Sequence, residues 1–128
     1  MSVTARGTFD VHLVPGPAEL DGVVNRFDFT KTFKGDLEGS GAGVMLSVGD
    51  PQRGSAGYVA VEIVRGRLGD REGAFALQQF GTLLDGSQTL HYEVVPGSGE
   101  RDLSGITGTL RLTIDGDGTH HFELEYDL

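Results

Sequence analysis

Apolar and polar residues alternate with a period of two along most of this chain, and this pattern limits the possible folds more than any other feature. The pattern is densest over residues 33–83, which contain the segments FKGDLEGSGAGVMLS, GSAGYVAVE and GAFALQQFGTL. Alternation of this kind is typical of β-strands with one buried face. No stretch between these segments has the period of a helix. The pattern therefore predicts an all-β protein.

Glycine accounts for 21 of the 128 residues, about twice its share in average proteins. Gly39, Gly41 and Gly43 lie on one face of a predicted strand, which allows that strand to bend sharply or leaves space beside it. Eight such strands joined by short loops favour one domain over residues 1–128, folded as a single eight-stranded antiparallel barrel, with a sandwich as the alternative. A barrel of this size is wide enough to be filled by side chains or to hold one small ligand.

The inward faces of the strands can be assigned from the same alternation. Phe27, Phe29 and Phe33 share a face that Lys31 interrupts, and we expect the Lys31 ammonium to extend to the barrel rim. On the next apolar strand, 59–63, the valines and the isoleucine are expected to point inward and Glu62 outward. A bulge at a neighbouring glycine would reverse that orientation.

Charge and composition exclude several classes of protein. The net charge of −9 repels phosphate backbones, which argues against binding to nucleic acid. Without cysteine there are no disulfides or thiolate ligands, and a cytoplasmic location is expected. No run approaches the ~20 apolar residues that span a membrane. No cofactor motif is present, and His120 and His121, adjacent on a strand, point to opposite faces, so no metal site is expected.

The segment VVPGSGERDLSGITGTL resembles a strand, loop and strand motif of allene oxide cyclases and dirigent proteins. Nearly the whole chain resembles an uncharacterised bacterial family of small proteins with an allene oxide cyclase-like barrel. The residues that carry this resemblance are FKGDLEG at 33–39, GSAGYVAVE at 54–62, GAFALQ at 73–78, VVPGSG at 94–99 and HHFELEYDL at 120–128.

The resemblance implies a barrel whose relatives use the interior for cofactor-free cyclisation or for stereochemical control of small organic molecules. It also implies a homo-oligomer, because allene oxide cyclases and dirigent proteins are oligomers. The bacterial family typically has a histidine where this chain has Gln79. This difference removes the best general base from the inward face and weakens the prediction of acid–base catalysis.

Two carboxylates are candidates for proton transfer, because both lie in the segments most similar to the family. A carboxylate of Glu62 or Glu38 that faced a dry cavity would have a raised pKa suited to acid–base chemistry. The alternative is that both point into solvent, and alternation favours that orientation for Glu62.

Five residues are candidate ligand contacts. Gln79, Tyr92 and Tyr126 are polar groups on mainly apolar faces, and they could orient a ligand or satisfy one another in a closed core. Tyr58 and Phe33 complete the set. Four residues expected on the outer face are less polar than the surface of a monomer requires, namely Tyr58, Ala60, Phe80 and Val95. If they lie close together, they would form an apolar patch that a partner subunit could cover.

We expect the barrel to bind one small, largely apolar organic molecule, and in a catalytic version to act as a cofactor-free cyclase or isomerase. The alternative is a non-catalytic structural or interaction module with a packed core. An interior filled by phenylalanine and leucine would favour the module. A void lined by Gln79 and a tyrosine would favour the ligand.

Overall fold

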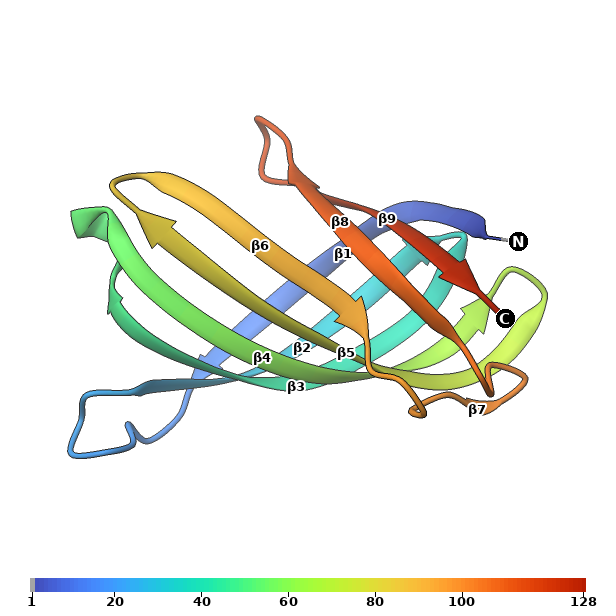
Figure 1. Cartoon of the computed structure of the whole chain (residues 1–128), viewed down its shortest axis with the longest axis horizontal. Coiled ribbons are helices and arrows are strands. Elements are labelled where there is room, and N and C mark those ends of the chain that lie inside the picture. The colour runs from blue at the N-terminus through green and yellow to red at the C-terminus, as the bar shows by residue number, and fades with distance from the viewer. Residues whose placement is uncertain (1) are drawn as a thin grey trace.

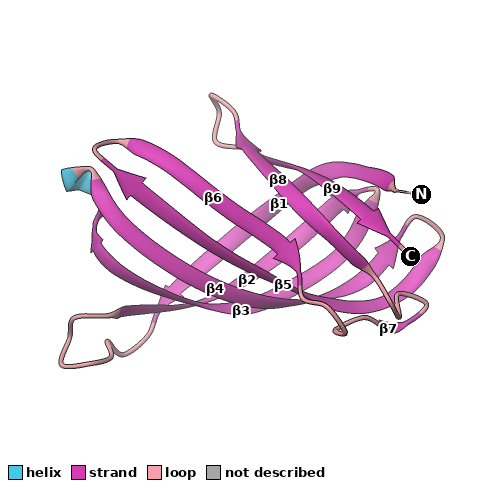
Figure 2. Cartoon of the chain, in the orientation of Figure 1, coloured by secondary structure: helices cyan, strands magenta, loops and turns pink. Residues whose placement is uncertain are grey.

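The computed structural model describes residues 2–128, which form nine strands and one short 3₁₀ turn, η1 (Figure 1). The elements in chain order are β1 (Val3–Pro15), β2 (Asn25–Gly35), β3 (Leu37–Asp50), η1 (Pro51–Arg53), β4 (Ser55–Leu68), β5 (Arg71–Leu84), β6 (Ser87–Val94), β7 (Glu100–Arg101), β8 (Thr107–Ile114) and β9 (His120–Asp127). Strands dominate the chain, as Figure 2 shows. Within the described residues, no helix is long and apolar enough to cross a membrane.

The strands form one closed antiparallel sheet. Each strand from β1 to β6 pairs with the next, β6 pairs with β8, β8 with β9, and β9 returns to β1. The two-residue β7 adds to an edge of β5. The joint between β6 and β8 is the weakest, with Glu93 opposite Thr109 as its single register pair. The predicted eight-stranded antiparallel barrel is therefore confirmed.

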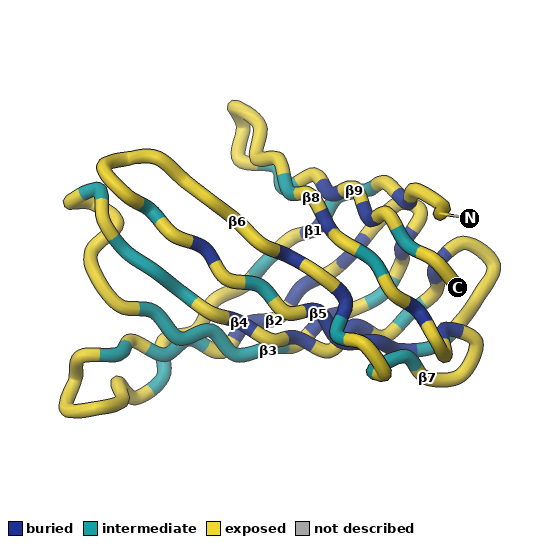
Figure 3. Tube along the Cα trace, in the orientation of Figure 1, coloured by how far each residue is buried: buried dark blue, intermediate teal, exposed yellow. Residues whose placement is uncertain are grey.

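One end of the barrel, here called the packed end, contains most of the buried side chains (Figure 3). Phe33, Phe75 and Phe122 are each at most 2% exposed there. The loop between β6 and β8 adds Leu103 and Ile106, both fully buried. The remaining large, fully buried apolar side chains of this core are Leu37, Val64, Leu68, Leu77 and Leu124.

The opposite end, here called the open end, is incompletely covered. Phe27, Met45 and Leu83 lie on inward faces there but are only half-buried. Leu13 and Leu90, also on inward faces, are 47% and 37% exposed. Because these apolar side chains point toward the barrel axis and yet meet solvent, this half of the interior is not closed by packing.

The two faces of strand β4 have the opposite orientation to the expected one. Val59 and Val61 point outward and are 54% and 50% exposed, whereas Glu62 points inward and is 2% exposed. The register with β3 and β5 is continuous along β4, so no bulge is needed. The inward face is set further along the strand, where Val64 and Leu68 are buried in the packed end. Because side chains alternate along a strand, these two residues also bring Glu62 inside.

The glycine face of β3 points inward, as predicted, but the space beside it is occupied. A Cβ at Gly41 would lie 3.1 Å from Glu62 Oε2 and 3.2 Å from a ring carbon of Phe33. A Cβ at Gly43 would collide with the Phe29 ring and lie 2.8 Å from Glu62 Cβ. The glycines thus make room for neighbouring side chains. The expectation that they leave empty space beside this face is wrong.

Candidate functional site

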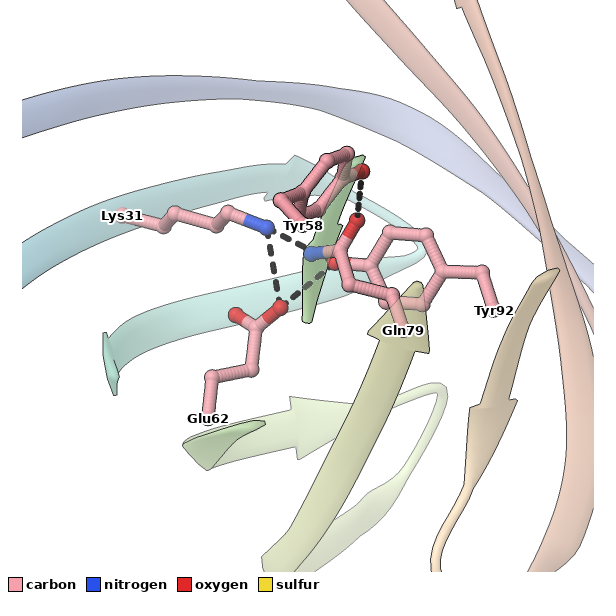
Figure 4. Close-up of polar contacts among 5 residues, drawn as sticks. All are labelled: Lys31, Tyr58, Glu62, Gln79 and Tyr92. Atoms are coloured by element: carbon pink, nitrogen blue, oxygen red, sulfur yellow. Dashed lines mark hydrogen bonds and ion pairs between the residues drawn. The ribbon is translucent and has the colours of Figure 1, made fainter. Parts of the chain in front are cut away.

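Three polar side chains from different strands meet inside the barrel, and they are called the buried cluster below. Lys31 of β2 donates from Nζ to Glu62 Oε1 of β4 at 2.9 Å and to the Tyr92 hydroxyl of β6 at 2.7 Å. The Tyr92 hydroxyl in turn donates to Glu62 Oε1 at 2.5 Å. Figure 4 shows the three groups converging from separate strands. The barrel closure is what brings them together.

The buried cluster is almost sealed from solvent. The side chains of Lys31 and Glu62 are 5% and 1% exposed, and Tyr92 is 5% exposed. Three aromatic rings surround the ammonium, with their centroids at 4.4 Å for Phe9 and at 5.3 Å for Phe29 and Tyr92. Lys31 therefore does not extend to the rim as expected. Its charge is held by one carboxylate and by cation–π contacts.

One carboxylate oxygen of the cluster is unsatisfied. Glu62 Oε2 is buried and has no hydrogen-bond partner among residues 2–128. Leaving a buried charged acceptor unpaired costs on the order of 1–3 kcal/mol or more. A buried ion pair is itself weak evidence for stability, because apolar residues of similar volume often serve as well. The cluster is therefore poorly explained as a device for stabilising the fold.

The cluster shifts the pKa values of its members in directions that have clear causes. Burial lowers the pKa of Lys31 below 10.5, and the charge and hydrogen bond of Glu62 oppose that shift. Burial raises the pKa of Tyr92 well above 10.0, and the charge of Glu62 raises it further. Tyr92 therefore remains a protonated hydrogen-bond donor through the physiological range, whereas Lys31 is more easily deprotonated than a lysine in water.

A second polar pair lies next to the cluster, toward the open end. The Tyr58 hydroxyl donates to Gln79 Oε1 at 2.7 Å, and both side chains are half-buried. The Tyr58 ring lies over Gly81, where a Cβ would be 3.0 Å from the ring carbon Cζ. Burial raises the pKa of Tyr58 above 10.0, and the charge of Glu62 adds to the shift. The three residues of the buried cluster and this pair together are called the polar floor of the open end.

The structure brings together most of the residues expected at the site. Glu62, Gln79, Tyr92 and Tyr58 all belong to the polar floor. Phe33 lies below it, with its ring centroid 5.5 Å from that of Phe9.

Two expected residues lie elsewhere. Glu38 is exposed on the outer surface, where it accepts a hydrogen bond from Arg67 at 2.8 Å, so it has the solvent-facing orientation and not the dry environment that proton transfer was expected to need. Tyr126 is half-buried and packs against the core of the packed end, away from the cluster.

Lys31 is the member of the buried cluster that the sequence did not mark as a candidate site residue. Its signal was present, because it is the one cation on a face of phenylalanines. The error was to assume that a long charged side chain would reach solvent. Glu62, on a strand 31 residues away, provides the partner that makes burial possible.

The outer face carries a hollow of about 470 Å³ over β3 to β6. Its lining includes Val44, Leu46, Val59 and Val61, together with Phe80, whose ring stacks on His91 at 4.5 Å. The expected outer group was Tyr58, Ala60, Phe80 and Val95. Of these, Phe80 lies on this face with its side chain 50% exposed, whereas Tyr58 and Ala60 point inward and Val95 is half-buried in a loop.

These observations define a closed antiparallel β-barrel with a buried lysine, glutamate and tyrosine cluster. Residues 5–126 match the family described as protein of unknown function DUF3224, and the chain belongs to that family. No curated protein matches the chain. Within residues 2–128, no group of three or more histidine, cysteine, aspartate or glutamate side chains is placed to hold a metal ion.

A solved structure supports the same assignment. The crystal structure of a DUF3224 protein of unknown function from Shewanella oneidensis MR-1 is 42% identical, with a TM-score of 0.93. The alignment covers 100% of this chain and 98% of that one. The expected bacterial family is therefore confirmed, while the likeness to allene oxide cyclase stays a prediction.

Proposed function

We propose that this barrel binds one small, largely apolar organic molecule at its open end, with the polar floor oriented toward the ligand's polar group. The observation that carries this proposal is Glu62 Oε2, a buried carboxylate oxygen without a partner in residues 2–128. A ligand hydroxyl or amine could supply the missing hydrogen bond. Half-buried Phe27, Met45 and Leu83 would cover the apolar body of the ligand.

A catalytic version of this function is a cofactor-free cyclase or isomerase. Tyr92 as a hydrogen-bond donor and Glu62 as a proton acceptor, 2.5 Å apart, are the groups such chemistry requires. A cytoplasmic location is proposed with it, because the chain has no cysteine to oxidise.

The binding proposal can be tested with a neutral apolar fluorophore, N-phenyl-1-naphthylamine, and with native mass spectrometry of freshly purified protein. Ser47 is a half-buried residue on the inward face of β3 near the open end, so Ser47→Trp should fill the site and abolish probe binding. Val61→Ser is the matched control on the outer face and should leave binding unchanged. Loss in Val61→Ser with retention in Ser47→Trp would place the probe on the outer hollow and overturn the proposal.

The alternative, a packed interaction module, is favoured by a different observation. The outer hollow is apolar, and Val59, Val61 and Phe80 on it are 54%, 50% and 50% exposed. Such a face would suit a second copy of this chain. Under this alternative, native spectra show an oligomer that Val61→Lys dissociates, and neither the probe nor a retained small molecule binds.

A further inference from the structure

The amine of Lys31 is a potential nucleophile, and ligand binding alone does not require one. Lysine occurs at only two positions in the chain, 31 and 34. Both lie in β2, but Lys31 is buried on its inward face and Lys34 is exposed on its outer face. The chain therefore contains its own matched comparison for the reactivity of a buried and an exposed amine.

The hydrogen bonds around Lys31 can be kept when the ammonium gives up one proton and becomes a neutral amine. An ammonium has three donors, whereas a neutral amine has two donors and one lone pair. Two acceptors lie within reach of Nζ, namely Glu62 Oε1 at 2.9 Å and the Tyr92 hydroxyl at 2.7 Å. The nearest ring is that of Phe9, with its centroid at 4.4 Å. Both donors of a neutral amine are thus satisfied and its lone pair is left over.

Glu62 is placed to take the proton that Lys31 must lose. Transfer along the 2.9 Å hydrogen bond from Nζ to Oε1 converts the ion pair into an amine and a carboxylic acid. On Oε1 that proton would be donated back to the Nζ lone pair, whereas on Glu62 Oε2, which has no partner within residues 2–128, it leaves the lone pair free. Neutralising both members of a buried pair also removes the cost of holding two charges away from water.

We propose that Lys31 forms a reversible imine with the carbonyl group of an aldehyde or ketone that has an apolar body. This inference rests on the binding function proposed above. The Nζ lone pair attacks the carbonyl carbon, and the electrons of the C=O bond move to oxygen, which takes a proton from Tyr92 or Glu62. The attached nitrogen returns one of its protons to the same residue, which gives a neutral carbinolamine. Its hydroxyl then takes a proton from Glu62 and leaves as water while the nitrogen lone pair forms C=N, and the nitrogen gives its remaining proton back to Glu62. The net change is amine plus carbonyl to imine plus water, and hydrolysis reverses it.

Burial is what separates Lys31 from an ordinary lysine in this chemistry. The same burial that lowers the pKa of Lys31 increases the fraction of attacking neutral amine at neutral pH. The apolar rings of Phe9 and Phe29 keep water from the nitrogen and so slow hydrolysis of the imine.

The experiment is reductive trapping with 2-naphthaldehyde and sodium cyanoborohydride at neutral pH, read by intact mass and by peptide mapping. We expect Lys31 to be labelled faster than Lys34, because burial lowers the pKa of Lys31 and so raises its neutral fraction. Lys34→Arg should leave the Lys31 label unchanged, and Lys31→Arg should abolish it. If Lys31→Arg does not fold, the ratio of the two labels in the unaltered protein decides.

A second probe separates failure of this inference from failure of the binding function. The alcohol 2-naphthalenemethanol has the same apolar body but cannot form an imine. If the alcohol binds and Ser47→Trp prevents this, yet only Lys34 or the N-terminus is labelled by the aldehyde, the imine is wrong and the binding function stands. If neither compound binds, both proposals are overturned.

Discussion

The two ends of the barrel are built from the same strands and yet have different interiors. At the packed end, Phe33, Leu37 and Phe122 are at most 2% exposed, and the loop after β6 closes the core with Leu103 and Ile106. At the open end, Leu13 and Leu90 on inward faces are 47% and 37% exposed. The buried cluster lies at the boundary between them. Burial of apolar side chains is therefore concentrated at one end, and the other end is less well packed.

The largest expected effect tests this division directly. Phe33→Ala should lower the free energy of unfolding by about 3–5 kcal/mol, because a closely packed site cannot collapse around the lost ring. Phe27→Ala on the same face of β2 should cost less than half as much, since its ring is already partly exposed. Urea unfolding of both variants measures the difference. Equal losses would mean that the open end is as well packed as the other.

The boundary can be tested by breaking the buried ion pair. Lys31→Met leaves the Glu62 carboxylate buried without a counter-charge and should cost about 3–5 kcal/mol. The double variant Lys31→Met/Glu62→Leu removes both charges and should recover most of that loss. Urea denaturation of the two variants and of Glu62→Leu completes a double-mutant cycle. A double variant as unstable as Lys31→Met would show that the pair stabilises the fold after all.

Substitution of either of two glycines in β4 by alanine should change stability less than the variants above, and the two sites can be compared with each other. A Cβ at Gly66 would collide with the Glu38 carbonyl oxygen and lie 2.8 Å from Gly39 Cα, so Gly66→Ala should cost about 1–3 kcal/mol by forcing the strands apart. A Cβ at Gly57 would meet only Gly81 O, at 3.8 Å. Gly57→Ala should therefore change stability by less than about 0.5 kcal/mol. Thermal unfolding monitored by circular dichroism compares the two.

The smallest effect appears at high pH. The pKa of Tyr92 is raised well above 10.0 in the fold, so the native state keeps a proton that the unfolded chain releases above about pH 10. Its stabilising effect is complete below that pH and is lost as pH rises toward the pKa in the fold.

Tyr92→Phe is the reference for this prediction, because it lacks the titrating hydroxyl. The unfolding free energy of the unaltered protein should fall relative to Tyr92→Phe between pH 10 and 11, measured by urea titration at each pH. Parallel curves would show that the phenol is not shielded as the cluster geometry requires.

Most of the architecture could be predicted from local patterns. Alternation placed Phe29 and Phe33 of β2 on an inward face, and both are buried. The glycines of β3 also share one face as predicted, although neighbouring side chains fill the space beside it. These assignments succeed because a strand with one buried face shows its orientation in a few consecutive residues.

The candidate site was harder to predict because it depends on partners from distant strands. Segment 59–63 has a valine and isoleucine face that resembles a core face, yet Val64 and Leu68 further along β4 turn it outward. Burial of Glu62 requires Lys31, and burial of Lys31 requires Glu62. No local sequence pattern shows that the burial of each residue depends on the other.

The sequence by itself determined an all-β chain and favoured a barrel over a sandwich, because period-two alternation and glycine placement are properties of neighbouring residues. Only the tertiary structure decided which face of β4 is inside and that Lys31, Glu62 and Tyr92 meet. A charge can be buried only when its counter-charge arrives at the same place, and that depends on the register of strands far apart in the chain.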